Sequence, residues 1–240
     1  MKKKLSVLFL CGIMAISAGA QGRLFENWGA GINVGLYGIG VQGATSLNPF
    51  LTARAGFDYL GFSYNGSVDF SADVMGMPGV TLDGDVSDFS MKFPNFKAMI
   101  DFYPVPTGIF SITAGLYIGS NRISADGMVH NYYLYPNAEF GFEDIIIRPN
   151  PDGSFGAKLK LGNVIKPYLG IGIGRTIPKE SRIGFRFELG LVYQGKMKLE
   201  SDNISDAGLN LVNDAAELDV PKGLLEFWPM MNFSLTYRIK

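Results

Sequence analysis

The chain of 240 residues has little of several features that would point to other classes of protein. It has one cysteine, Cys11, and one histidine, His130. After the first twenty residues it has no apolar run of the about eighteen residues that a transmembrane helix needs. Lysine and arginine number 21 against 22 acidic residues, so no basic excess indicates a nucleic-acid partner. A disulfide framework, a helical membrane protein and a nucleic-acid-binding protein are thereby excluded.

The first residues have the pattern of a secretory signal peptide. Three lysines are followed by an apolar run over 5–16 and by small residues that end at Ala20. The run is too short to anchor the chain across a bilayer. We expect cleavage after Ala20, which makes 1–20 a signal peptide and 21–240 one exported domain. Cys11 leaves with the signal, so the mature chain has no thiol.

What the mature chain has in abundance is alternation between apolar and polar residues. In RIGFRFELGLVYQG, 182–195, every odd position from Ile183 to Tyr193 is apolar and almost all even positions are polar or glycine. A period of two is typical of a β-strand with two unlike faces. Other segments repeat it at about the nine to eleven residues that a tilted transmembrane strand needs. They are LTARAGFDYL (51–60), NFKAMIDFY (95–103), IFSITAGLYIGS (109–120), KPYLGIGIGR (166–175) and NFSLTYRIK (232–240).

The predicted connections between strands alternate between short and long. Short ones lie at 46–49, 104–108 and 176–181, and long ones at 65–90, 121–164 and 196–227. This order fits an up-and-down barrel with tight turns on one side of a membrane and long loops on the other. We therefore expect the long connections to be extracellular loops.

The number of strands depends on two segments. In WGAGINVGLYGIGVQGAT, 28–45, the apolar residues move from even to odd positions between Leu36 and Ile39. The switch indicates either a turn near 37–38, which gives eight strands, or a bulge in one long strand. We interpret SFGAKLKLG, 154–162, as an extension of the following strand, while an extra hairpin there would make ten strands. The expected fold is all-β, an antiparallel up-and-down transmembrane β-barrel of eight strands with ten as the alternative.

The composition of the two faces separates a membrane barrel from a soluble one such as a lipocalin. The polar face combines glycines with a few charges, as a narrow interior demands, whereas a soluble barrel would present long charged side chains to bulk water there. The apolar face is bulky and has aromatic residues towards strand ends, among them Tyr193, Trp228 and Tyr237. Such girdles are typical of a lipid-facing wall. A secreted soluble β-barrel is the alternative.

Several segments together resemble a known family. The similarity is to the small outer-membrane β-barrel proteins of Gram-negative bacteria, the outer membrane protein A-like eight-stranded superfamily. It is carried by the signal, by DFYP before a short turn, and by FSITAGLY, KPYLGIGIG, FRFELGLVYQG and the terminal SLTYRIK. The resemblance implies a monomer in the outer membrane, in contact with lipid and lipopolysaccharide and inserted by the barrel-insertion machinery. Members of this group often end in an aromatic residue, whereas this chain ends in Lys240.

Charged residues also occupy the alternate positions whose side chains are predicted to point into the barrel, which we call the inward positions. They are Arg54, Asp58, Lys97, Asp101, Arg182, Arg186, Glu188 and Arg238. Isolated charges in a narrow lumen are costly, so we expect these residues to pair with one another. Because an eight-stranded interior is only just wide enough for side chains, the paired charges predict a closed lumen. A gate or a narrow ion path is the alternative.

The sequence offers little support for catalysis or for a bound cofactor. His130 lies in the tyrosine-rich segment VHNYYLYP, where a surface contact is the simpler interpretation. DGDVSD, 83–88, has acidic spacings loosely like a calcium loop, but Pro94 stands where that loop needs its glutamate. We expect no enzyme, metal or cofactor. The sequence favours a noncatalytic barrel for membrane integrity or surface contact, with a channel or transporter for small or hydrophobic molecules as the alternative.

Overall fold

The structure describes most of the chain beyond its first 24 residues. The computed structural model describes residues 25–135, 137–142, 145–205, 209 and 226–239. The predicted signal peptide lies outside these residues. Within them the chain is mostly β-structure, with short helical pieces such as the 3-10 turn η1 (Tyr132–Leu134). No helix in this part of the chain is long and apolar enough to cross a membrane.

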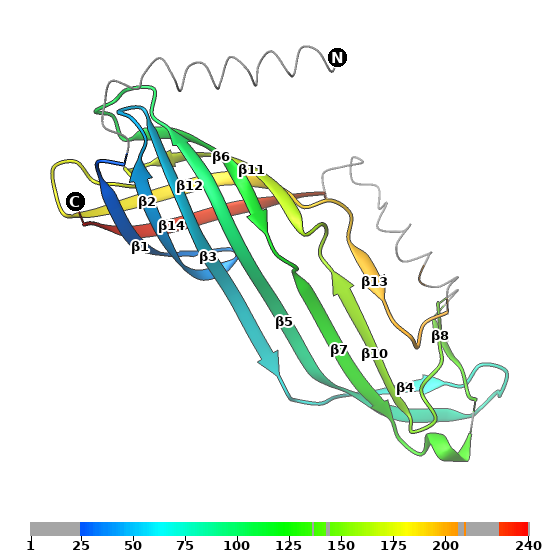
Figure 1. Ribbon diagram of the computed structural model, residues 1–240. Helices are drawn as coiled ribbons and strands as arrows, with labels where there is room; N and C mark the ends of the chain where they lie inside the picture. Colours follow the sequence, from blue (N-terminus) through cyan, green and yellow to red (C-terminus); the bar gives the residue numbers. More distant parts are fainter. Residues whose placement is uncertain (1–24, 136, 143–144, 206–208, 210–225, 240) are drawn as a thin grey trace, which may run out of the picture.

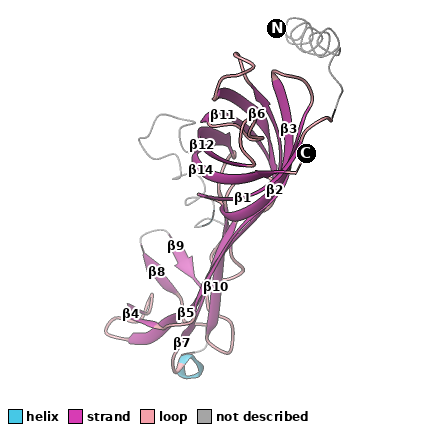
Figure 2. Ribbon diagram, turned by 90° about the vertical axis from the view of Figure 1, so that its left-hand side faces the viewer, coloured by secondary structure: helices cyan, strands magenta, loops and turns pink. Residues whose placement is uncertain are grey.

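Antiparallel pairing joins a set of strands into a closed ring (Figure 2). In order around the ring they are β1 (Trp28–Gly35), β2 (Gly38–Ser46), β3 (Leu51–Tyr64), β5 (Thr81–Phe102), β6 (Phe110–Ile118), β11 (Ile165–Ile173), β12 (Ile183–Tyr193) and β14 (Phe227–Arg238). The β5–β6 and β1–β14 pairings close the ring, so each strand has a hydrogen-bonded neighbour on both sides. The prediction of an all-β antiparallel fold is confirmed.

The parity switch in the first stretch is a tight turn between β1 and β2. Gly35 pairs with Gly38, and Leu36 and Tyr37 connect the two strands. Gly38 has a φ of +92°, a left-handed conformation that glycine adopts readily because it has no Cβ. A Cβ there would also lie 2.1 Å from the carbonyl oxygen of Tyr59. The structure thus has the turn and not the bulge.

The connections at the opposite end of the ring are short. They join β2 to β3, β5 to β6 and β11 to β12, where the sequence predicts tight turns. In the first of them, Asn48 Oδ1 accepts hydrogen bonds from the backbone N–H groups of Phe50 and Leu51, both at 2.8 Å. An asparagine side chain that bonds the backbone just after it is typical of a tight turn.

The long connections are largely β-structure, which corrects the expectation of loops. Beyond the ring, β3 and β5 continue as a sheet with β4 (Val68–Asp73), β7 (Arg122–Val129), β10 (Ser154–Lys160) and β13 (Lys198–Glu200) (Figure 1). A second small sheet contains β8 (Phe140–Phe142) and β9 (Ile145–Ile147). We call these parts the extension. Strand β10 pairs with β7 as β11 pairs with β6, and β6 and β7 lie one after the other along β5. Strand β10 therefore extends the line of β11 beyond the ring, as the interpretation of 154–162 predicts, and adds no hairpin to the ring.

The two faces of the ring strands differ sharply. On the outward face, Ile39 and Phe185 are 71% and 76% exposed. On the inward face, Lys97 and Asp101 are 2% and 0% exposed. Soluble proteins have the reverse order, because burying a charge is costly and exposing apolar surface to water is unfavourable. The ring therefore has a charged inside and an apolar outside.

Candidate functional site

The ring encloses buried charged residues from β3, β5 and β12. They are Arg54, Asp58, Lys97, Asp101, Arg186 and Glu188, each at most 5% exposed. Six of the eight charged residues predicted at inward positions thus lie inside the ring. We call these residues the lumen network, and they form two groups.

The larger group is built around Glu188. Its Oε2 accepts hydrogen bonds from Arg54 Nη2 and, at 2.9 Å, from Arg186 Nη2. Arg186 Nε reaches the same oxygen at 3.1 Å. The other oxygen, Oε1, accepts the hydroxyl of Tyr168 at 2.7 Å. Both carboxylate oxygens are therefore bonded, as a buried carboxylate requires.

Asp101 is the second acidic centre of this group. Its Oδ1 lies 3.2 Å from Arg54 Nε and 3.3 Å from Arg186 Nη2. The hydroxyl of Thr113 donates to Oδ1 at 2.7 Å, and that of Thr176 donates to Oδ2 at 2.5 Å. The two guanidinium groups are thus held between two carboxylates, an arrangement that suits their planar, multiply donating geometry.

Lys97 and Asp58 form the second group on the neighbouring strands β5 and β3. Lys97 Nζ lies 2.8 Å from Asp58 Oδ1. The amide of Asn33 connects both partners, because its Nδ2 donates to Asp58 at 2.9 Å and its Oδ1 accepts from Lys97 at 2.8 Å. A Cβ at Gly40 would lie 1.9 Å from Asp58 Oδ1. Glycine on β2 therefore leaves room for the carboxylate.

The lumen network has three cations and three carboxylates. Lys166 of β11 is a further buried cation that the sequence analysis missed, and its Nζ donates to Asn95 Oδ1 at 3.0 Å and to the carbonyl oxygen of Gly119 at 2.6 Å. Buried ions lose their hydration, and only close opposite charges and further hydrogen bonds offset that loss. Removing one member of such a network costs about 3–5 kcal/mol, because the remaining charge stays buried without a partner. The network can therefore fill the inside of the ring as a unit.

An apolar cluster fills the ring on the side of the extension. Its buried members are Tyr37, Phe93, Met99, Tyr117, Leu161, Tyr168, Val192 and Met230, and we call it the aromatic plug. Tyr117 lies edge-on to Tyr37 and to Tyr168, with ring centroids 5.1 and 5.6 Å apart. Met99 and Tyr117 occupy predicted inward positions. The alternation within one strand does not show, however, which inward residues of different strands contact each other in this cluster. Network and plug together occupy the lumen with packed side chains.

Arg182 and Arg238 do not join the lumen network, contrary to the expectation from their parity. Arg182 Nη1 donates to the hydroxyl of Tyr237 at 3.4 Å, in an exposed position. Arg238 Nη1 donates to the backbone carbonyl of Pro178 at 3.2 Å. Both arginines lie at the short-turn end, where their long side chains reach turn carbonyls and solvent instead of the lumen.

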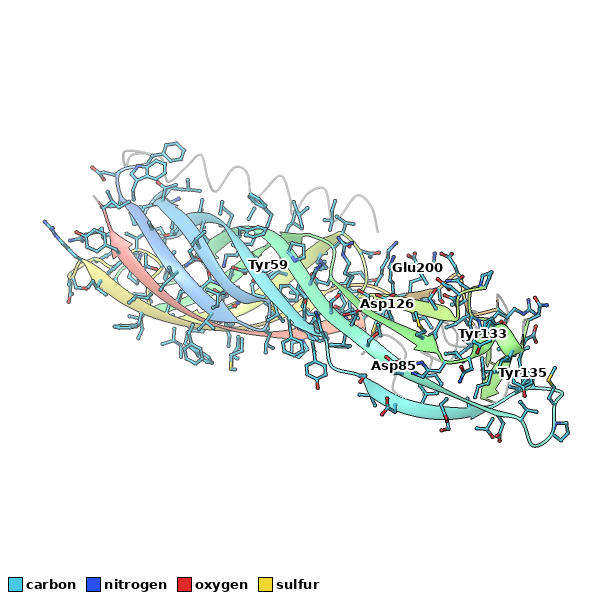
Figure 3. All side chains as sticks on the ribbon, turned by 90° about the horizontal axis from the view of Figure 1, so that it is seen from below. Tyr59, Asp85, Asp126, Tyr133, Tyr135 and Glu200 are labelled. Atoms are coloured by element: carbon cyan, nitrogen blue, oxygen red, sulfur yellow. The ribbon has the colours of Figure 1, made fainter. Side chains whose placement is uncertain are left out.

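His130 lies on the extension, away from the lumen network. Its Nε2 is 3.0 Å from Asp85 Oδ1, and its side chain is 52% exposed. Figure 3 shows Asp85 on the extension and Tyr59 on the wall of the ring. Among the described residues, no group of three or more histidines, cysteines or acidic residues is placed to hold a metal ion.

An antiparallel ring with a charged inside and an apolar outside is the arrangement of transmembrane β-barrels. The fold is similar to Acinetobacter baumannii CarO2, with a TM-score of 0.51 and 21% identity over 90% of this chain and 100% of CarO2. For Acinetobacter baumannii CarO the TM-score is 0.51, with 19% identity over 90% of this chain and 99% of CarO. No protein-family model matches the chain, and no curated protein matches it by sequence. At these identities the likeness shows a shared fold.

Proposed function

We propose that the chain is an eight-stranded outer-membrane β-barrel of a Gram-negative bacterium, with a closed lumen and no catalytic role. The strands of the ring are its transmembrane strands. The observation that carries this proposal is the polarity of the ring, which buries paired charges and exposes an apolar wall. An apolar surface of this extent favours aggregation in water, whereas lipid solvates it.

Aromatic residues at both ends of the wall support a membrane-spanning band. Trp28 and Tyr237 are exposed at the short-turn end. Tyr59, Tyr193 and Phe227 are exposed at the end that leads to the extension, where the rings of Tyr193 and Phe227 lie 5.3 Å apart. Strand β12 has 11 residues between these ends, which is the length that a tilted strand needs to cross a bilayer.

The extension supports a role in surface contact. Outer-membrane barrels have short periplasmic turns and longer extracellular segments, which assigns the extension to the outside of the cell. Tyr133 and Leu134 are 73% and 59% exposed. Figure 3 shows Tyr133 and Tyr135 at the end of the extension far from the ring. A sheet that holds aromatic side chains away from the membrane is suited to contact with the cell's surroundings.

Planar-bilayer conductance of the purified protein tests the closed lumen. We expect almost no conductance from the natural protein. Glu188→Ala should raise conductance, because it leaves Arg54 and Arg186 short of a counter-charge and draws water into the lumen. Glu180→Ala makes the same charge change at an exposed position of a short turn and should conduct like the natural protein. Large stable channels in the natural protein, or unchanged conductance in folded Glu188→Ala, would contradict a closed lumen.

A narrow polar path is the second candidate function, and unpartnered polar atoms in the ring favour it. Within the described residues, Gln42 Nε2, Asp58 Oδ2 and Thr236 Oγ1 are buried without a hydrogen-bond partner. Buried polar atoms of this kind usually bind ordered water. Small, stable conductance that Asp58→Asn alters and Glu180→Ala leaves unchanged would favour the narrow path over the closed lumen.

A further inference from the structure

A row of basic residues crosses the extension next to the ring. Cross-strand pairing places Lys92 of β5 opposite Arg122 of β7, Arg122 opposite Lys160 of β10, and Lys160 opposite Lys198 of β13. All four side chains are exposed. Because neighbouring strands lie about 4.8 Å apart, the row is about 14 Å long. We call it the basic row.

The basic row begins directly where the apolar wall ends. On the outward face of β5, Phe96 pairs with Phe57, and the next outward pair is Pro94 with Tyr59. The following outward residue on β5 is Lys92. Tyr59 is exposed and belongs to the aromatic girdle described above. Along the outward face of β3 and β5, two phenylalanines are therefore followed by the girdle residue Tyr59 and then by Lys92.

The positive charge of the row is only partly neutralised by the protein itself. Lys160 and Lys198 share Glu200, with Nζ to carboxylate distances of 2.7 and 3.5 Å. The hydrogen bond from Lys160 holds the pKa of Glu200 below its usual value, which favours the charged carboxylate beside the two lysines. Figure 3 shows Glu200 on the extension.

Lys92 and Arg122 form no ion pair within the described part of the chain. Like charges directly opposite each other on neighbouring strands are destabilising. An anion that binds both side chains would remove this repulsion. The position of the two residues, one step beyond the aromatic girdle, is the level of the headgroups on the outer surface of the membrane.

We propose that the basic row binds the phosphate groups of a lipopolysaccharide headgroup in the outer leaflet. This inference rests on the proposed function, because it needs the ring to lie in the outer membrane with the extension outside. Arginine and lysine are the residues that bind phosphate, arginine in a planar fork and lysine as a point charge. Basic clusters just outside a membrane-spanning segment bind anionic headgroups through the same attraction. The row thus fixes the depth and rotation of the protein beside its lipid neighbours.

Binding of lipid A to the detergent-solubilised protein, counted by native mass spectrometry over a lipid titration, tests the proposal. Lys92→Gln with Arg122→Gln should weaken binding by about tenfold or more, given the contribution of each basic residue near an anionic headgroup. Lys179→Gln with Arg182→Gln removes the same charge at the short-turn end and should bind like the natural protein. The charge-conserving pair Lys92→Arg with Arg122→Lys should restore most of the affinity.

The phosphate groups are tested with lipid A from which they have been removed. This lipid should bind the natural protein and the Lys92→Gln, Arg122→Gln variant equally weakly. Equal affinity of the natural protein for both lipids, or an equal loss in the short-turn control, would overturn the proposal. A third outcome would show that the ligand is free phosphate and not a lipid. In that outcome, inorganic phosphate binds the natural protein but not the Lys92→Gln, Arg122→Gln variant, whereas lipid A binding does not depend on these residues. A change of gel mobility on boiling reports the folded barrel in each variant, which separates a failure of this site from a failure of the proposed fold and location.

Discussion

Arg54 on β3 and Glu188 on β12 form an ion pair across the inside of the ring, although they are 134 positions apart in the chain. Their strands are not neighbours in the ring. By contrast, Arg186 and Glu188 lie on the same strand and could pair in an open sheet. The contact between Arg54 and Glu188 therefore depends on closure of the ring and connects its opposite walls.

The lumen network should contribute strongly to stability. We expect Asp101→Asn to lower the free energy of unfolding by about 3–5 kcal/mol, because Arg54 and Arg186 lose negative charge while they stay buried. Asp126→Asn makes the same change at an exposed position of the extension and should have little effect. Urea unfolding in micelles, followed by tryptophan fluorescence, measures both. Similar losses in the two variants would argue against the network as a source of stability.

Two glycines of β2 provide a test of the inward packing. A Cβ at Gly40 would lie 1.9 Å from Asp58 Oδ1, whereas a Cβ at Gly43 would have no atom within 4 Å. Gly40→Ala should therefore displace Asp58 from Lys97 and cost about 1–3 kcal/mol, the usual cost of overpacking. Gly43→Ala should be neutral or slightly stabilising, since alanine loses less backbone freedom than glycine on folding. Urea unfolding in micelles measures the free energy of unfolding of both variants. A larger loss for Gly43→Ala than for Gly40→Ala would show that the inward and outward faces are reversed.

The lipid-facing wall should reject a charge. Leu189 is exposed near the middle of β12, so Leu189→Arg should cost about 2–4 kcal/mol if this face meets lipid at the midplane. Val68 is an exposed apolar residue of β4 on the extension, and Val68→Arg should be nearly neutral there. The free energy of unfolding is measured after refolding into vesicles. A nearly neutral Leu189→Arg would contradict the membrane-facing assignment.

The orientation in the membrane can be tested with cysteine labelling, because the only natural cysteine is Cys11 in the predicted signal. Tyr133→Cys at the exposed tip of the extension should react with a membrane-impermeant maleimide in intact cells. Glu180→Cys in a short turn should react only after the outer membrane is opened. Labelling of Glu180→Cys in intact cells, with Tyr133→Cys protected, would mean the opposite orientation. Recovery of the protein as a soluble periplasmic species would contradict the membrane assignment altogether.

The extension shows why part of the fold was not predicted from the sequence. Strand β5 has 22 residues, and its apolar residues change from odd positions over 89–93 to even positions over 96–102, where the strand lies in the ring. In the extension its pairing with β7 shifts between Ser87 and Ser90, and Asp88 has a φ of 47°. Because β4 is short and the apolar parity of β5 changes along the strand, no single period of two runs through 65–90, and the segment resembles a loop in sequence. Strand β10 alternates regularly and was predicted, whereas β13 has only three residues, too few to show a period.

The sequence by itself determined the two faces of the ring strands, because side chains on a β-strand alternate in direction whatever their partners are. That alternation placed Arg54, Lys97, Asp101 and Glu188 on the inward face, and the parity switch marked the turn before Gly38. Which inward residues meet was decided only by the tertiary structure. Contacts across the lumen depend on ring closure and on the register of strands distant in sequence, and neither is encoded in the alternation of one strand. The Arg54–Glu188 pair, the aromatic plug and the departure of Arg182 and Arg238 to the short-turn end all follow from that closed geometry.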